Sequence, residues 1–437
     1  MGLKVCKFGG TSMAECKTIT QVANIIKSDP ERRYVVVSAP GRRVASDPKI
    51  TDTLYKCYDE KVATGTCQKS FQIIRDRFSE IVSDFKLTLD IKSLLDEIEA
   101  NINKSTAPDY AASSGEYLSA RILAEVLNFE FIDAGDLIKF DSEGKFDSEY
   151  TNDTASEILS HTKYAVIPGF YGKMPDCSIK TFSRGGSDVS GAIIARAAKA
   201  SVYENWTDVN GFMTTDPRVV NNPLPIEKVS YKELRELSYM GASVLHPDAI
   251  FPVAMNNIPI NIRNTFEPQH NGTMIVPEVK ENYDRIVTGI AGKKGFTVIQ
   301  IEKSMMNNEV GFARRILSVL EHYNISFEHM PSGIDTMSIV ISDTELNGKL
   351  DELIKHLHEK LSLDSVEVNS NMALIATVGH GMSKKQGTAA RLFSALARGN
   401  VNIRMIDQGS SELNIIVGVE SDDYEQAIKS IYNEFIK

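Results

Sequence analysis

Cysteine is scarce in this chain, with five residues in 437 and none in a Cys-x-x-Cys pair. This scarcity argues against a disulfide framework and against a zinc site of the usual spacing. The sequence also lacks any run of about 18 consecutive apolar residues, so it predicts no membrane-spanning helix. No apolar signal-peptide core follows the first residue, and we therefore expect a cytoplasmic protein.

Basic residues are also fewer than acidic residues. Lysine and arginine number 48 against 58 acidic residues, which gives a formal net charge of −10, and no long basic run offsets this balance. We therefore do not expect nucleic acid as a partner. A phosphate ligand stays open, because a few local cations and backbone N–H groups can bind an anion whatever the net charge.

Short β-branched runs without a polar face alternate with helix-like stretches over residues 1–280. This alternation predicts a parallel sheet with helices on both faces, an α/β/α sandwich. Apolar residues at helical spacing over 71–85 and 91–102 predict a helical insertion between residues 42 and 115. The expected strands are 3–8, 34–37, 129–132, 164–167, 202–206 and 258–262.

The last third of the chain contains an internal repeat with an offset of 76 residues, which aligns Gly311 with Gly387 and Asn324 with Asn400. Each copy has the strand and helix order of a ferredoxin-like domain. The second copy stops before its last strand, and a spare strand at 285–290 precedes the first copy. We therefore predict that this segment completes the sheet of the second copy, with the first copy inserted into the second.

Two glycines follow the first expected strand, in the run Lys7-Phe8-Gly9-Gly10-Thr11-Ser12. They let the backbone approach a phosphate closely, and Lys7 adds a positive charge. The run matches neither GxxxxGK[ST] nor GxGxxG, so it predicts neither a P-loop nor a Rossmann dinucleotide site. A tight turn without a ligand explains this run about equally well.

Further polar turns follow along the chain. In residues 183–188, Arg184 can hold a carboxylate in a bidentate fork, and Asp188 can cap a helix or organise a lysine. Glu116 either complements a helix dipole or receives an ammonium group. Residues 206–218 follow a strand end, where ligands bind in open parallel sheets, although they could be turn residues only.

Together these segments resemble the aspartokinases. Lys-Phe-Gly-Gly-Thr-Ser, Ser-Gly-Glu, Ser-Arg-Gly-Gly-Ser-Asp, Thr-Asp-Val-x-Gly, Thr-Thr-Asp-Pro-Arg and Val-Leu-His-Pro occur in the family's order. The repeat resembles the tandem ACT domains of the monofunctional, lysine-sensitive type. The resemblance implies an amino-acid-kinase-type catalytic domain over 1–280 and two ferredoxin-like ACT domains, one over 296–370 and one over 284–292 plus 371–437. It also implies an enzyme that phosphorylates the side-chain carboxylate of L-aspartate with ATP and Mg²⁺, the first step toward lysine, threonine and methionine.

The resemblance also implies roles for individual residues. Lys7 would be catalytic, and Asp188 would orient it. The nucleotide would contact Lys7, Gly9, Gly10, Ser12, Thr207, Asp208 and Arg218. The aspartate would contact Ser38, Thr51, Glu116, Arg184 and Ser187. Within this second set, Glu116 would take the amine and Arg184 the α-carboxylate.

Two positions depart from the family's pattern. Met213 stands where members often have tyrosine, which removes a ring that could stack on the nucleotide. Ser243 stands where they often have lysine, which removes a cation near ATP. The neighbouring His246 is followed by Pro247, and we expect it to be structural.

The lack of a Ser-His-Asp or Cys-His constellation is no objection to this function. A side-chain carboxylate has a pKa of about 3.9, so it is ionised at neutral pH and needs no general base. The barrier lies in bringing an anionic nucleophile to an anionic phosphate. Cations, Mg²⁺ and oriented N–H groups lower that barrier.

The ACT pair implies feedback inhibition by an end-product amino acid, L-lysine, with L-threonine as the alternative or as a joint effector. Glu328 can pair with an ammonium group, whereas the second copy has Arg404 at the matching position, so we place the effector in the first copy. ACT sheets that pair between subunits imply a homodimer or homotetramer. The predicted effector residues are Met306, Gly311, Phe312, Ser326, Phe327 and Glu328.

Two other functions stay open at this point. One is another amino-acid kinase of the glutamate type, which the Ser-Arg-Gly-Gly-Ser-Asp turn and the ACT pair disfavour. The other is a non-catalytic amino-acid sensor, which the set of Lys7, Glu116 and Arg184 disfavours. A fused homoserine dehydrogenase is not expected, because the chain stops just after the repeats.

Overall fold

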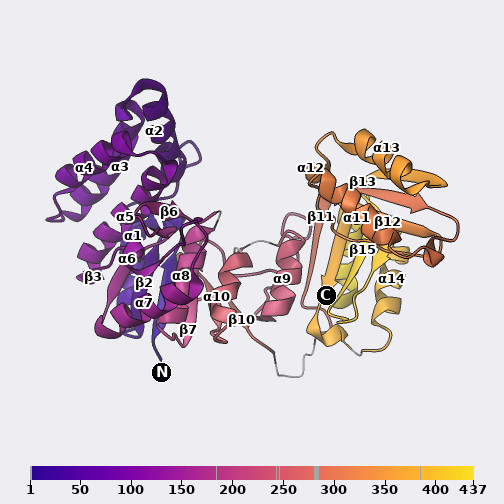
Figure 1. The fold of residues 1–437 in the computed structure, drawn as a ribbon. Helices are drawn as coiled ribbons and strands as arrows, with labels where there is room; N and C mark the ends of the chain where they lie inside the picture. The colour runs from indigo at the N-terminus through magenta and orange to yellow at the C-terminus, as the bar shows by residue number, and fades with distance from the viewer. Residues whose placement is uncertain (1, 184, 243, 246, 280–284, 384) are drawn as a thin grey trace. The chain divides into compact units, whose positions relative to one another are not determined.

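The computed structural model describes residues 2–183, 185–242, 244–245, 247–279, 285–383 and 385–437. They form two compact units (Figure 1). Two segments from the first 280 residues, 213–224 and 233–243, group with the second unit. Unit 1 consists of Met1–Phe212, Pro225–Lys232 and Val244–Lys280, and unit 2 of Met213–Leu224, Glu233–Ser243 and Glu281–Lys437.

Unit 1 is built on a sheet whose eight described strands have the order β3-β4-β2-β1-β7-β9-β10-β8. Neighbouring strands pair in parallel, except β9 and β10, which are antiparallel. The predicted parallel α/β core is thus confirmed. The strands are β1 (Lys4–Phe8), β2 (Arg32–Val37), β3 (Glu130–Phe131), β4 (Ala165–Pro168), β7 (Val202–Thr207), β8 (Lys228–Ser230), β9 (Ile260–Asn264) and β10 (Thr273–Val276).

Helices cover both faces of this sheet. On one face, α1 (Cys16–Lys27) and α5 (Pro108–Leu127) share a hydrophobic core with Cys6 and Phe8 of β1. On the other face, α8 (Gly186–Ala197) packs on β1, β2 and β7. The remaining elements of unit 1 are η1 (Gly10–Met13), α2 (Ile50–Thr64), α3 (Gln68–Phe85), α4 (Ile91–Lys104), α6 (Ala134–Leu137), α7 (Ser148–His161), the hairpin β5 (Tyr171–Lys173) and β6 (Ile179–Thr181), η2 (Pro247–Ala249) and α10 (Ile250–Ala254).

The helical insertion consists of α2, α3 and α4 (Figure 1). Phe71, Ile74 and Phe78 of α3 recur at helical spacing and are fully buried, so this stripe attaches the helix to the core of unit 1.

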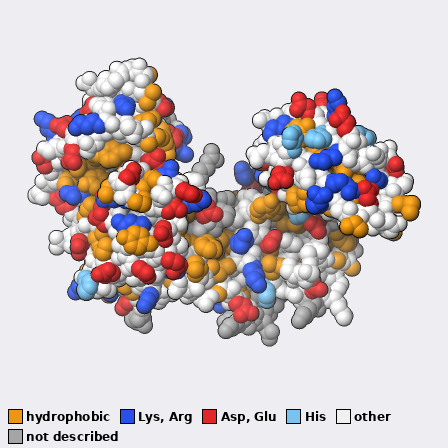
Figure 2. All heavy atoms as spheres, in the orientation of Figure 1, with side chains coloured by type: hydrophobic (Ala, Val, Ile, Leu, Met, Phe, Trp, Pro, Cys, Tyr) orange, Lys and Arg blue, Asp and Glu red, His pale blue; other side chains and the backbone are white. Residues whose placement is uncertain are grey.

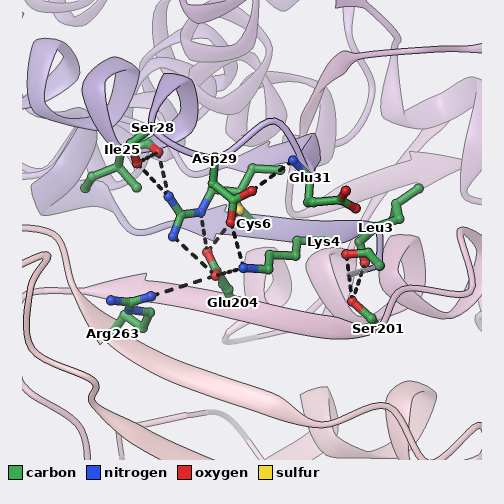
Figure 3. A network of polar contacts seen from close by, with 12 residues as sticks. Leu3, Lys4, Cys6, Ile25, Ser28, Asp29, Glu31, Ser201, Glu204 and Arg263 are labelled. Atoms are coloured by element: carbon green, nitrogen blue, oxygen red, sulfur yellow. Dashed lines mark hydrogen bonds and ion pairs between the residues drawn. The ribbon is translucent and has the colours of Figure 1, made fainter.

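A buried carboxylate links four strands on the face that carries Cys6 and Phe8. Glu204 of β7 (Figure 3) is 2% exposed. It accepts hydrogen bonds from Arg32 Nε at 2.8 Å and Trp206 Nε1 at 2.9 Å. The ammonium of Lys4 lies 3.7 Å away and the guanidinium of Arg263 3.9 Å away. Burial acts to raise the pKa of Glu204, but Arg32 and the other cations outweigh it and lower that pKa. The Glu204 carboxylate is therefore held by several cations in a structural network rather than a reactive site.

Unit 2 is built on an antiparallel sheet with the order β12-β11-β13-β15-β14. Two long strands, β11 (Gly289–Glu302) and β13 (Ser365–Val378), run through both ferredoxin-like copies. Residues 289–294 of β11 pair with 373–378 of β13, which lies beside β15 (Asn414–Glu420) of the second copy. Residues 296–302 pair with residues 365–372 of β13 on one side and with β12 (Thr336–Ser342) of the first copy on the other. Of the segment predicted as a spare strand, 285–290, only residues 289–290 belong to β11, at the end that pairs within the sheet of the second copy.

Each copy has its own hydrophobic core, in which a Gly-started helix packs on the sheet. Helix α9 (Tyr231–Tyr239) also joins unit 2: its Glu233 accepts hydrogen bonds from Thr288 Oγ1 at 2.6 Å and from His380 N at 2.8 Å. The remaining elements are η3 (Met306–Asn308), α11 (Phe312–His322), α12 (Asp343–Leu346), α13 (Leu350–Leu361), η4 (His380–Met382), α14 (Thr388–Arg398), β14 (Met405–Asp407) and α15 (Tyr424–Phe435).

Among the residues that the model describes, no helix combines the length and the apolar character needed to cross a membrane.

Candidate active site

The candidate site lies where β1, β2 and β7 end. Phe8 pairs with Val37 and with Trp206, so the turns after these three strands leave the same edge of the sheet. The first two turns touch: Gly41 N donates to Gly10 O at 2.7 Å, and a Cβ on Gly41 would lie only 2.7 Å from the Gly10 carbonyl carbon. Glycine is therefore required for these turns to meet.

Lys7 and Asp188 form a close ion pair at this edge. Lys7 Nζ lies 2.6 Å from Asp188 Oδ1, and the two side chains are 9% and 15% exposed. Lys7 comes from the end of β1 and Asp188 from the first turn of α8, 181 residues later in the chain. The structure thus brings together the pair that the sequence resemblance joined.

Asn205 is a third member of this cluster that the sequence did not indicate. Its Nδ2 donates to Asp188 Oδ1 at 2.9 Å, the same oxygen that faces Lys7. The available signal was a polar residue within an expected buried strand, whereas its register with Lys7 on the neighbouring strand is seen only in the structure.

Glu116 has a buried carboxyl group in which one oxygen atom accepts no hydrogen bond from the described residues. The side chain belongs to α5, is 4% exposed, and its Oε2 has no hydrogen-bond partner in the described part of the chain. Burial raises the pKa of Glu116 to about 8, although a backbone hydrogen bond from Ala39 and the charge of Lys7 act to lower it. A buried carboxyl of this kind can receive a cationic group, which would replace the solvation that it lacks.

Three predicted aspartate contacts lie on elements that reach the same edge. Ser38 directly follows β2, and its N–H donates to Phe8 O at 3.1 Å. Thr51 is the second residue of α2 and is half-buried. Ser187, in the first turn of α8, is 9% exposed and packs against Gly169, where a Cβ would lie 2.8 Å from its own Cβ.

The predicted nucleotide contacts of unit 1 differ in the solvent exposure of their side chains. Ser12 is fully buried, and its hydroxyl shares a 2.8 Å hydrogen bond with Thr265 Oγ1. Thr207 is half-buried and donates from Oγ1 to Asp208 Oδ1 at 3.2 Å, while Asp208 itself is exposed. In the described structure Ser12 therefore fixes its turn, whereas Asp208 is open to solvent.

Several other predicted residues belong to unit 2 or lie outside the described part of the chain. Arg218 belongs to unit 2, where its exposed guanidinium binds Asp216 through Nε at 3.0 Å and Nη2 at 2.6 Å. Met213 also belongs to unit 2. Arg184, Ser243 and His246 lie outside the described residues.

The predicted effector residues sit at one end of the first ACT-like copy. Met306 and Phe312 are buried in its core, and Gly311 precedes α11 with a φ of 81°. Ser326 and Phe327 are exposed.

Glu328 has a partner in α9. Burial, together with a hydrogen bond to the Glu328 carboxylate, raises the pKa of the Tyr239 hydroxyl to about 12. The acid that we assigned to an effector ammonium thus contacts Tyr239 in this structure.

Known proteins resemble both parts of the chain. The model of the Amino acid kinase family matches residues 2–264, and an ACT domain model matches residues 375–435. Aspartokinase 3 of Bacillus subtilis (strain 168) is 36% identical over 455 residues, which cover 99% of this chain and 98% of that protein. The chain spans about half the length of the plant bifunctional aspartokinase/homoserine dehydrogenases that it also matches.

Two solved proteins match the whole chain. The aspartate kinase of Clostridium acetobutylicum is 51% identical with a TM-score of 0.92 and full coverage of both chains. Aspartokinase III of E. coli, solved with aspartate and ADP and again with lysine and aspartate, is 26% and 27% identical, with TM-scores of 0.76 and 0.77 and full coverage of both chains.

Proposed function

Because this chain belongs to the amino acid kinase family and, within it, to the aspartokinases, we propose that it transfers the γ-phosphoryl group of ATP to the side-chain carboxylate of L-aspartate. The products are 4-phospho-L-aspartate and ADP. Within the structure, the observation that carries this proposal is the pairing of Lys7 with Asp188 beside the buried, partly unpartnered carboxylate of Glu116. This edge offers one cation for phosphate and one anion for an amine.

The chain's own residues act mainly by electrostatics. The nucleophile is already ionised, so the protein has to hold it against an anionic phosphate and stabilise the charge that develops during transfer. Lys7 supplies a positive charge that Asp188 fixes in direction. Mg²⁺ would enter with ATP, whose phosphates would supply most of its ligands, and would neutralise part of the charge on the phosphoryl group.

Recognition of aspartate follows from its two charged ends. Glu116 receives the ammonium group, since its Oε2 has no other partner in the described structure. Arg184 takes the α-carboxylate in a bidentate fork. Ser38, Thr51 and Ser187 add hydrogen bonds.

The test of this function is ADP formation by the purified chain with MgATP and either L-aspartate or L-glutamate. We expect turnover with aspartate and little with glutamate. Equal rates would indicate a kinase of broader or different specificity, and no ADP with either acid would favour the non-catalytic sensor.

We propose that unit 2 makes the enzyme sensitive to L-lysine. E. coli aspartokinase III has been solved with lysine and aspartate, and Glu328 offers a carboxylate at the turn of the first copy. The Thr214–Arg218 motif belongs to the same unit: Ile290 N donates to Thr214 O at 2.7 Å, and Leu224 N donates to Tyr432 Oη at 3.2 Å. A change in the ACT pair could thus reach a predicted nucleotide contact directly. L-Threonine, alone or together with lysine, is the second candidate effector.

The prediction is that lysine inhibits the wild type and that Glu328→Ala loses most of this inhibition. An ammonium–carboxylate contact of about 1.5–3 kcal/mol corresponds to a rise of about 10- to 150-fold in the inhibitory concentration. Glu359→Ala, which removes an exposed acid on α13 of the same copy, is the matched control and should keep its sensitivity. An unchanged response of Glu328→Ala would refute this site, and no response of the wild type to lysine or threonine would refute regulation.

We also propose that the chain assembles as a homodimer or homotetramer through its ACT domains. Three apolar side chains in loops of the first copy are strongly exposed: Met305 at 67%, Val310 at 96% and Ile334 at 70%. Elsewhere, acidic and basic side chains are interspersed over the visible face of each unit (Figure 2). Exposed apolar side chains of this kind support burial against a second subunit.

A further inference from the structure

The carboxylate of Asp188 is held at one oxygen by two donors. Lys7 Nζ lies 2.6 Å from Oδ1, and Asn205 Nδ2 donates to the same atom at 2.9 Å. Lys7 and Asn205 are register partners on the adjacent parallel strands β1 and β7, so both side chains point to the sheet face that α8 covers. The Asn205 amide is only 3% exposed.

The backbone of Asp188 is fixed by the same strand. Tyr203 Oη donates to Asp188 O at 3.0 Å, and Asn205 Nδ2 also lies 3.4 Å from that hydroxyl. Helix α8 approaches closely here, because a Cβ on Gly191 would lie 2.4 Å from Tyr203 Oη. Strand β7 thus fixes both the position of the first turn of α8 and the direction of its carboxylate.

We propose that Asn205 is a positioning residue for phosphoryl transfer, because its amide fixes the Asp188 carboxylate that in turn aims the Lys7 ammonium. A carboxylate held by Lys7 alone could turn about its own bond and move with the lysine. The second, uncharged donor fixes its orientation without competing with the phosphate for Lys7. This inference rests on the proposed role of Lys7.

A simpler alternative is that the amide only attaches α8 to the sheet. Two variants separate the two roles. Asn205→Leu removes the donor at similar volume, and we expect kcat to fall about tenfold or more while KM for ATP and aspartate changes less than threefold. A purely structural amide would lower the melting temperature and leave kcat of the folded enzyme unchanged.

Asn205→Asp gives the sharper test, because it places a second carboxyl group beside Asp188. Two carboxyl groups at hydrogen-bond distance share one proton. The protonated pair reproduces the native hydrogen bond, whereas two anions repel each other and compete for Lys7. The other titratable groups around this point are Tyr203 on β7 and Glu116 on α5, and both variants retain them.

We therefore expect the ratio of the kcat of Asn205→Asp to that of the wild type to fall at least tenfold as the pH rises from 6 to 9. The matched control is Asn103→Leu, which removes an amide oxygen that accepts from Cys67 N at 2.9 Å in the helical insertion. It should lose stability and keep the wild-type kcat and pH profile.

If the kcat of Asn205→Asp depends on pH in the same way as that of the wild type, the positioning role is overturned, even if Asn205→Leu does not fold. Failure of Asn205→Asp to fold at pH 6 would also overturn it, since the protonated pair should restore the native contact. If the wild type does not phosphorylate aspartate at all, the proposed function fails first, and the wild-type arm shows this separately.

Discussion

Replacing Lys7 by methionine should lower kcat by about 10²–10³-fold and change KM for ATP and aspartate much less. Methionine keeps most of the volume of the side chain but removes the ammonium that lies 2.6 Å from Asp188. The charge matters most when negative charge develops on the transferred phosphoryl group, so its loss raises the barrier more than it weakens substrate binding. Steady-state kinetics at saturating MgATP and aspartate measure this effect.

The matched control is Lys4→Met on the same strand. Lys4 binds Asp29 at 2.7 Å and lies at the opposite end of β1 from the candidate site. We expect it to lose some stability and to keep nearly all of its kcat. A Lys7→Met enzyme with most of the wild-type kcat, or an equal loss in both variants, would contradict the catalytic role of Lys7.

The second large effect concerns Glu116. At pH 9, where most of the Glu116 carboxyl is ionised, Glu116→Gln should raise KM for aspartate by about 10- to 150-fold, the effect of losing a charged hydrogen bond of about 1.5–3 kcal/mol, with KM for ATP little changed. The amide keeps the shape of the carboxyl group but cannot pair with the substrate ammonium. Equal changes in both KM values would contradict the assignment of Glu116 to the amine of aspartate.

This carboxyl also predicts a pH dependence. With a pKa of about 8, Glu116 is mostly protonated at pH 7 in the free enzyme, and only its ionised form binds an ammonium group. The ionised fraction rises from about 1% at pH 6 to about half at pH 8. The wild-type kcat/KM for aspartate should therefore rise through this range, and that of Glu116→Gln should stay nearly flat.

Stability should change in the opposite direction. Between pH 4.5, the ordinary pKa, and about 8, the folded protein keeps a proton on Glu116 that the unfolded chain has lost. The free energy of unfolding therefore falls as pH rises through this window, with a limiting slope of about 1.4 kcal/mol per pH unit. Glu116→Gln lacks this fall, so its melting temperature relative to wild type should increase from pH 5 to pH 8. A constant difference would contradict the raised pKa.

Local patterns in the sequence predicted most of the fold. The β-branched run at 34–37 lies within β2, because a run without a polar face can only be buried in a covered sheet. The strand predicted at 202–206 lies within β7, although Glu204 and Asn205 interrupt its apolar residues. The stripe of Phe71, Ile74 and Phe78 similarly predicted α3. The pairing of Lys7 with Asp188 followed from family motifs, not from periodicity.

Contacts that depend on strand register could not be predicted. Asn205 reaches Asp188 only because β7 lies beside β1 in the register that pairs it with Lys7. Ser12 was assigned to ATP, but its hydroxyl is engaged by Thr265, 253 residues away in the chain. The grouping of residues 213–224 with unit 2 likewise depends on packing that no local motif encodes.

The central claim is that this site phosphorylates the side-chain carboxylate of aspartate. The most direct measurement uses L-aspartate labelled with ¹⁸O in that carboxylate, MgATP, and hydroxylamine to trap the acyl phosphate. Hydroxylamine attacks the acyl carbon, so the phosphate that leaves carries the bridging oxygen that came from aspartate. The account predicts one ¹⁸O in the released phosphate, in equal amount to ADP, and a fall of about 10²–10³-fold in the rate of both in Lys7→Met. ADP formed together with unlabelled phosphate would contradict it.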